Sequence, residues 1–319
     1  MTKVFILSLL ALSYQTASAQ SLLETFGSGA NQFTMDFVTI GNPGNAADTT
    51  GSPNPAGSVA YTYNLGKYEV SRDMIDKANS AGGLGITLGD LTIYGGNGVN
   101  RPATGITWYE AAKFVNWLNT STGGTAAYKF DGSGRFQLWS EGDAGYDANN
   151  LFRNSLAKYV IASSNEWYKG AYGSADGSWS NFPNGWDFSP MPVAGGTDEN
   201  TAVYRQSIST GPADITNAGG LSAYGTMAQG GNVYEWVETA QDGSNNITDE
   251  NRESRGGRWY SDSAYLSAST RNTLGLTPSV ELTLPAGLIG FRVASVPEPS
   301  SFSLLAIGLG GLALVRRRK

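Results

Sequence analysis

The clearest periodic stretch in the chain is Gly-Gly-Asn-Val-Tyr-Glu-Trp-Val at residues 230–237. Valine and glutamate alternate there with Tyr234 and Trp236, which is the period-two pattern of a β-strand. The two leading glycines let the backbone adopt positive φ or approach another segment closely. Because Glu235 stands between two large aromatic residues, we expect its carboxylate to be shielded from water. A structural acceptor or ion ligand is the favoured interpretation, and a catalytic carboxylate is the alternative.

Other stretches predict further strands and helices. Alternation predicts strands at residues 33–40 and 61–70, and residues 290–294 predict a closing strand. Apolar residues at helical spacing follow capping residues at three places, two of which have Ser or Thr three residues before Glu. The predicted helices run from Ser71 to Ala78, from Trp108 to about Asn119 and from Trp167 to Ala171.

The remaining stretches are rich in Gly, Asn and Pro and predict loops, notably residues 41–57, 82–101 and 173–220. We expect the last of these to be pinned by its own aromatic residues, Trp179, Phe182, Trp186 and Phe188. The composition agrees, because 42 glycines accompany an aromatic content of 11% and a charged content of only 15%. One irregular, loop-rich α+β domain from about residue 32 to 295 is therefore predicted.

The chain contains no histidine and no cysteine. Ser-His-Asp and Cys-His catalysis, His-ligated or thiolate metal sites and disulfides are thereby excluded. Chemistry is left to Asp, Glu, Tyr, Lys, Arg, Ser and Thr, and any metal has to be a hard cation bound by oxygen.

The amino-terminal residues predict a secretory signal peptide, residues 1–19. Lys3 precedes an apolar run over residues 4–12, and Ala-Ser-Ala at 17–19 has the small side chains of a cleavage site.

The carboxyl-terminal end has three parts. Val296-Pro297-Glu298-Pro299 is followed by an apolar stretch at 300–315 and by Arg-Arg-Arg-Lys. The apolar stretch, about 24 Å long as a helix, predicts a marginal transmembrane segment whose basic end stays cytoplasmic. The tail resembles the PEP-CTERM sorting signal of bacteria that make exopolysaccharide. The resemblance implies handling by exosortase, export, transient membrane anchoring and trimming near the motif, and exopolysaccharide or a cell-surface protein is a candidate partner.

The whole chain has a formal net charge of −6, and loss of the basic tail makes the mature part more acidic. Nucleic acid and anionic lipid are therefore poor partners, whereas divalent cations are plausible counter-ions.

Three ordered motifs carry a family resemblance: Gly231-Asn-Val-Tyr-Glu-Trp, Arg255-Gly-Gly-Arg-Trp and Gly290-Phe-Arg-Val. Together they resemble the formylglycine-generating enzymes, also called sulfatase-modifying factor domains. The resemblance covers nearly all of the mature chain and implies a C-type-lectin-like α+β fold with little regular structure.

Members of the family have two kinds of metal site, which can be compared with this sequence position by position. In the family's oxidases a pair of cysteines binds copper, and the matching positions here are about Ser261 and Leu266. Because neither residue is a cysteine, copper-dependent oxidation is not expected. The iron site of relatives that use histidines is not expected either, because the chain has no histidine. The family places calcium near the first motif, where Gly231, Val233 and Glu235 match, but the fourth position falls at about Ala228, which has no side-chain oxygen. Calcium stays a candidate cofactor.

Two function classes follow. The leading hypothesis is an exported, non-catalytic binding or structural module with a ligand surface at Arg258, Trp259, Tyr260 and Ser261, for a glycan or a protein; the alternative role for Trp259 and Tyr260 is to close the core. The competing hypothesis is a divergent enzyme that uses Tyr or a carboxylate pair. Glu235 and Glu238 do not provide such a carboxylate pair, because residues three apart on a strand face opposite sides, and this weakens the enzyme hypothesis. A third option, a hypervariable ligand-binding protein, expects an Asn-rich segment before Gly290 that residues 274–288 do not provide.

Overall fold

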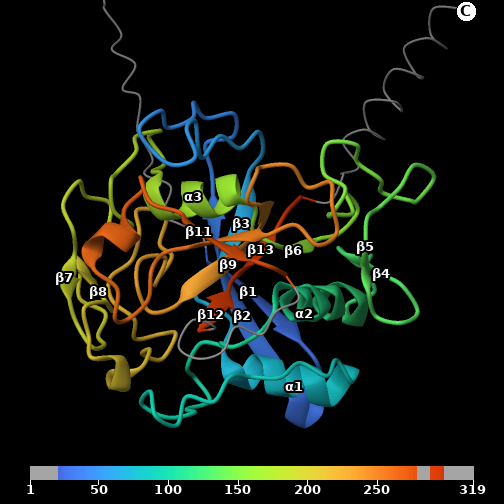
Figure 1. The fold of residues 1–319 in the computed structure, drawn as a ribbon, viewed down its shortest axis with the longest axis horizontal. Helices are drawn as coiled ribbons and strands as arrows, with labels where there is room; N and C mark the ends of the chain where they lie inside the picture. Colours follow the sequence, from blue (N-terminus) through green and yellow to red (C-terminus); the bar gives the residue numbers. More distant parts are fainter. Residues whose placement is uncertain (1–20, 279–287, 298–319) are drawn as a thin grey trace, which may run out of the picture.

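The computed structural model describes residues 21–278 and 288–297, and Figure 1 shows how their elements are arranged. The helices in this part are α1 (Arg72–Gly82), α2 (Trp108–Ser121) and α3 (Ser164–Tyr172). Short 3₁₀ helices lie at Gly29–Asn31, Ile208–Thr210 and Ser263–Leu266. The strands are β1 (Ser21–Phe26), β2 (Phe33–Ile40), β3 (Tyr63–Gly66), β4 (Lys129–Phe130), β5 (Phe136–Gln137), β6 (Tyr159–Ile161), β7 (Met191–Pro192), β8 (Thr201–Ala202), β9 (Tyr234–Ala240), β10 (Arg252–Arg255), β11 (Asn272–Leu276), β12 (Ile289–Phe291) and β13 (Val293–Ser295).

The capping residues place the helices as the sequence predicts. The Thr107 hydroxyl accepts a hydrogen bond from the Glu110 backbone, and the Glu110 carboxylate accepts one from the Thr107 backbone, so a complete capping box starts α2. Ser163 and Glu166 form the same box at α3, which therefore begins three residues earlier than predicted. Ser71 caps α1, which runs four residues beyond the predicted Ala78.

A five-stranded sheet has the order β1-β2-β3-β13-β6. β2 coincides with the predicted strand, whereas β3 is shorter than the prediction of 61–70. β1 was not predicted, because Leu22 and Leu23 are both exposed and no apolar alternation marks the strand. It is held by antiparallel backbone pairing with β2, from Ser21 opposite Val38 to Phe26 opposite Phe33.

A four-stranded sheet has the order β11-β10-β9-β12, with β12 parallel to β9. The predicted closing strand is in fact two strands: β12 belongs to this sheet and β13 to the five-stranded one, with Arg292 between them. The chain therefore passes from one sheet to the other at a single residue.

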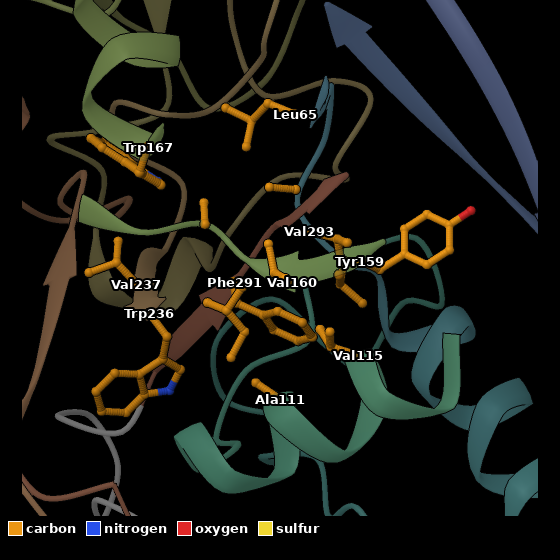
Figure 2. Close-up of a cluster of buried hydrophobic side chains, with 14 of the residues drawn as sticks. Leu65, Ala111, Val115, Tyr159, Val160, Trp167, Trp236, Val237, Phe291 and Val293 are labelled. Atoms are coloured by element: carbon orange, nitrogen blue, oxygen red, sulfur yellow. The ribbon is translucent and has the colours of Figure 1, made fainter. Parts of the chain in front are cut away.

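The core lies where helices meet the two sheets. In Figure 2, Ala111 and Val115 of α2 face Val160 of β6 and Phe291 of β12, and all four are fully buried. Trp236 of β9 is also buried in this cluster, and its indole donates to the Ile106 carbonyl at 3.1 Å. Apolar burial of this kind supplies most of the stability of a domain.

Long segments without regular structure connect these elements, as the glycine-rich composition predicts. Residues 41–57 and 83–101 contain no helix or strand. The predicted signal peptide (1–19), Glu298, Pro299 and the apolar stretch 300–315 lie outside the described residues. Among the described residues, no helix is both long enough and apolar enough to cross a membrane.

Candidate ligand-binding surface

Glu235 forms a buried ion pair with Arg292. Both side chains are inaccessible to solvent, and the guanidinium holds both carboxylate oxygens, with Nε–Oε2 at 2.6 Å and Nη2–Oε1 at 2.5 Å. The Trp167 indole donates to Oε2 at 2.6 Å. Arg292 also donates to the carbonyls of Gly66 and Met227, each at 2.8 Å. A pair with this geometry fixes the point where the chain changes sheets.

The backbone before Glu235 takes the conformation that its glycines permit. Gly231 has φ of 92°, and a Cβ there would collide with the Val203 carbonyl. Asn232 also has positive φ, 56°, and its side chain accepts from the Ala213 backbone at 2.8 Å. The predicted positive φ and the predicted close approach are therefore both present in this turn.

The residues matched to the family's calcium site do not fit a cation at Glu235. Both oxygens of that carboxylate already accept from the Arg292 guanidinium, so a cation beside them would face a positive charge. The matching position Ala228 has no side-chain oxygen, and Gly231 and Val233 provide only backbone atoms. Across residues 21–278 and 288–297, no group of three or more acidic side chains is placed to hold a metal ion.

Glu238 pairs with a different arginine, Arg153, whose side chain is 12% exposed. Arg153 contacts Glu166 at 2.9 Å and Glu238 at 2.8 Å. Burial by itself would raise the pKa of Glu166, but the Arg153 charge and hydrogen bonds from Arg153 and Tyr61 lower it to about 2. Because Glu235 and Glu238 each serve a different arginine, they do not form an acid/base pair.

Glu69 lies beside the first ion pair as a buried acid. Its Oε2 accepts from the Asn232 amide at 2.6 Å, and its Oε1 has no hydrogen-bond partner among the described residues. Burial, followed by the negative charge of Glu235, raises the pKa of Glu69 well above its ordinary value of 4.5. The raised pKa favours the protonated form of this side chain, which packs next to the Glu235–Arg292 pair.

The four residues predicted to bind a ligand differ in exposure. Trp259 is fully buried, and its indole donates to the Ile208 carbonyl at 3.0 Å, so this side chain closes the core, as the alternative interpretation held. Ser261 is also buried, and its hydroxyl accepts from the Arg258 backbone at 3.1 Å. Arg258 and Tyr260 are partly exposed.

Arg258 and Tyr260 form the accessible part of this loop. The guanidinium carbon lies 4.1 Å from the centre of the Tyr260 ring and 5.6 Å from that of Tyr234. Tyr265, 48% exposed, stands a few residues further on. A cation held between aromatic rings keeps its charge in a fixed place, which makes it an ordered contact point for a ligand.

The positions matched to the copper-binding cysteines lie in the same loop. Ser261 is held by its bond to the Arg258 backbone, and Leu266 is fully buried beside Ala202 and Tyr204. Neither side chain is a thiolate, and the sequence has no cysteine or histidine to replace one.

A family model for the sulfatase-modifying factor enzyme 1-like domain matches residues 33–296. The chain belongs to this family. A second model, for the PEP-CTERM protein-sorting motif, matches residues 295–319, which shows export and carboxyl-terminal sorting to the cell surface or the extracellular space by an exosortase-type system. No curated protein matches the chain.

Solved structures show that this sulfatase-modifying factor-like protein has the fold of the family. Treponema denticola variable protein 1 is 18% identical, with a TM-score of 0.57 over 86% of this chain and 99% of that one. CarF is 17% identical, with a TM-score of 0.56 over 82% and 98%. PvdO from Pseudomonas aeruginosa is 18% identical, with a TM-score of 0.52 over 86% and 98%. At these identities the likeness establishes the fold and not the activity.

Two aromatic residues outside the family motifs are exposed where the sequence predicts that they pin a loop. Trp186 and Phe188 are each 54% exposed, whereas Trp179 and Phe182 of the same segment pack against the core. The expectation that all four pin the loop is therefore wrong for half of them. The sequence gives only a weak indication that Trp186 is exposed: its immediate neighbours, Asn184-Gly185 and Asp187, are not apolar.

Proposed function

We propose that the mature protein is a non-catalytic binding module outside the cell, with its ligand surface on the loop that carries Arg258, Trp259, Tyr260 and Ser261. The observation that supports this most directly is the partly exposed Arg258 guanidinium, 4.1 Å from the Tyr260 ring. In this proposal Arg258 and Tyr260 contact the ligand, while the buried side chains of Trp259 and Ser261 fix the conformation of the loop.

The loop is rigid enough to present such a surface. The Trp259 backbone donates to the Asn232 carbonyl, and the Gln206 backbone donates to the Trp259 carbonyl, each at 2.8 Å. The Arg205 backbone donates to the Ser261 carbonyl at 3.0 Å. A ligand that meets a prearranged surface loses less conformational entropy on binding.

The residue types favour a glycan or a protein as the ligand. Arginine and tyrosine are enriched where proteins bind each other, and an aromatic ring also stacks on a sugar. Exopolysaccharide and cell-surface proteins are the candidate partners that accord with sorting to the cell surface. The absence of cysteine and histidine supports binding over the family's copper chemistry.

The test is binding of the purified full chain to a glycan array and to a cell-envelope protein fraction. We expect at least one ligand class to bind, and Tyr260→Ala and Arg258→Ala to weaken that binding about tenfold or more. The chain should be kept in a detergent without a sugar headgroup, because such a headgroup would compete for the same surface.

Tyr146→Ala is the matched control. It removes a partly exposed tyrosine from the loop after β5, which lies across the molecule from β7 and β8 in Figure 1. The proposed surface is on the β8 side, since the Ser261 carbonyl accepts from Arg205, three residues after β8. Tyr146→Ala should leave binding unchanged. Equal binding by the wild-type chain and both loop variants would contradict the proposed surface, and copper-dependent oxidation of a cysteine peptide would contradict the non-catalytic role.

A further inference from the structure

The stacked pair Trp186 and Phe188, here called the aromatic platform, is the largest exposed aromatic feature of the described residues outside the proposed loop. Each side chain is 54% exposed, and the ring centres lie 5.4 Å apart with the planes inclined by 27°. Met191, which starts β7, is 59% exposed. Large aromatic rings left in water on a folded protein indicate a binding function.

The backbone holds the aromatic platform in place from both sides. The Phe182 backbone donates to the Trp186 carbonyl at 3.0 Å, and the Asn181 backbone donates to the Asp187 carboxylate at 3.1 Å. Beyond the platform, the Tyr204 hydroxyl donates to the Pro190 carbonyl at 2.5 Å. The rings are therefore presented in a fixed arrangement and do not need to be ordered by the ligand.

The charge near the aromatic platform is mostly negative, and Arg205, the next basic residue along the chain, is paired with Asp262 at 3.3 Å. Between Lys169 and Arg205 the chain has Asp176, Asp187, Asp198 and Glu199 but no lysine or arginine. The segments that pack against this loop come from residues 217–224 and 262–270, through Ala223, Leu266 and Ala268, and they also lack basic residues. An anionic ligand would therefore be repelled here.

We propose that the aromatic platform binds an uncharged saccharide chain by stacking sugar rings on Trp186 and Phe188. The apolar face of a pyranose fits a flat ring of this size, and the exposed Asn181, Asp187 and Ser189 next to the rings accept and donate hydrogen bonds to hydroxyl groups. A protein partner is the less suitable occupant, since a stable protein interface needs about 800 Å² per partner with buried anchors, and two rings in a polar loop provide much less. The aromatic platform shares no residue with the Arg258, Trp259, Tyr260 and Ser261 surface, and this proposal does not rest on that surface.

The test is affinity electrophoresis of the full chain, in a detergent without a sugar headgroup, through gels that contain a dissolved polysaccharide. Dextran, glucomannan and a mixed-linkage glucan serve as uncharged probes, and alginate serves as the anionic probe. We expect retardation by at least one uncharged polymer and none by alginate. Trp186→Ala should raise the apparent dissociation constant about tenfold or more, and Trp186→Phe, which keeps a ring, should recover part of the binding.

Two controls separate this site from the proposed loop and from unfolding. Tyr260→Ala should bind the uncharged polymer as the wild type does, and Trp186→Ala should keep the wild-type melting temperature because its ring is half exposed. The proposal would be overturned if no uncharged polymer retards the chain, if alginate is preferred, or if Trp186→Ala migrates like the wild type. Loss of binding in both Trp186→Ala and Tyr260→Ala would instead indicate one site that uses both rings and would contradict a separate site on the aromatic platform.

Discussion

Two parts of the molecule use large polar and aromatic residues in opposite ways. In the family motifs, Glu235, Arg292 and Trp259 are all buried and each is hydrogen-bonded inside the core. In the loop outside those motifs, Trp186 and Phe188 are exposed. Most residues that make the family recognisable therefore build the scaffold, and Arg258 is the partly exposed exception. Recognition of the family does not by itself locate the binding surface.

The buried ion pair should give the largest loss of stability. Arg292→Met leaves the Glu235 carboxylate uncompensated and should lower the free energy of unfolding by about 3–5 kcal/mol. The double variant Glu235→Leu with Arg292→Met removes the stranded charge and should recover part of the loss. Urea or guanidinium unfolding of the three proteins measures both effects.

Lys77→Met is the surface control for that comparison, because Lys77 forms an ion pair with Asp73 along α1 and is partly exposed. It should change stability little, as surface pairs do. Similar losses for Lys77→Met and Arg292→Met would show that the central pair is not a structural anchor.

The two tryptophans test the same contrast with one side-chain type. Trp259→Ala empties a fully buried site and should cost about 3–5 kcal/mol, whereas Trp186→Ala should stay within about 0.5 kcal/mol. Thermal or denaturant unfolding measures both. A large loss for Trp186→Ala would mean that its loop needs the indole for packing, which would remove the reason to regard it as a ligand contact.

The pH dependence of stability should distinguish two buried carboxyl groups, those of Glu166 and Glu69. Glu166 has a pKa of about 2 in the folded protein against an ordinary 4.5, so its stabilising effect is complete above pH 4.5 and is lost as the pH falls toward 2. A shift of this size corresponds to about 3 kcal/mol. Glu166→Gln should therefore be much less stable than the wild type at pH 7 and nearly equal to it near pH 2.

Glu69 should behave in the opposite sense. Its pKa is raised in the folded protein, so ionisation destabilises the fold as the pH rises above 4.5. Glu69→Gln should match the wild type below pH 4.5 and become the more stable of the two at neutral pH. Unfolding curves across pH 3–8 measure both variants, and parallel pH profiles for them would contradict the assignment of one charged and one neutral carboxyl group.

Features fixed by neighbouring residues could be predicted from the sequence. The capping boxes depend on side chains three residues apart, and the strand at β2 depends on local alternation, so both were found. The burial of Glu235 followed from its aromatic neighbours. The fold class followed from the order of the family motifs and is confirmed by the family model and the structural neighbours.

Features that depend on distant residues could not be predicted. The partner of Glu235 lies 57 residues away, and nothing near Arg292 indicates that the chain changes sheets there. The exposure of Trp186 and the burial of Trp259 are equally non-local, since each stands near glycine and polar residues in the sequence and no apolar periodicity distinguishes them. β1 escaped prediction because its backbone pairing with β2, and not apolar burial, holds it.

The helix caps give the smallest expected effect and test this division between local and distant features. Thr107→Ala removes the side-chain acceptor for the Glu110 backbone at the start of α2 and should cost about 1 kcal/mol, as cap replacements usually do. Thr107→Ser keeps a hydroxyl and should restore most of that loss in the same unfolding experiment. If Thr107→Ala instead lowers the free energy of unfolding as much as Arg292→Met, the cap is coupled to the core through α2. A feature predicted from four consecutive residues would then stabilise the fold as much as an ion pair that only the structure shows.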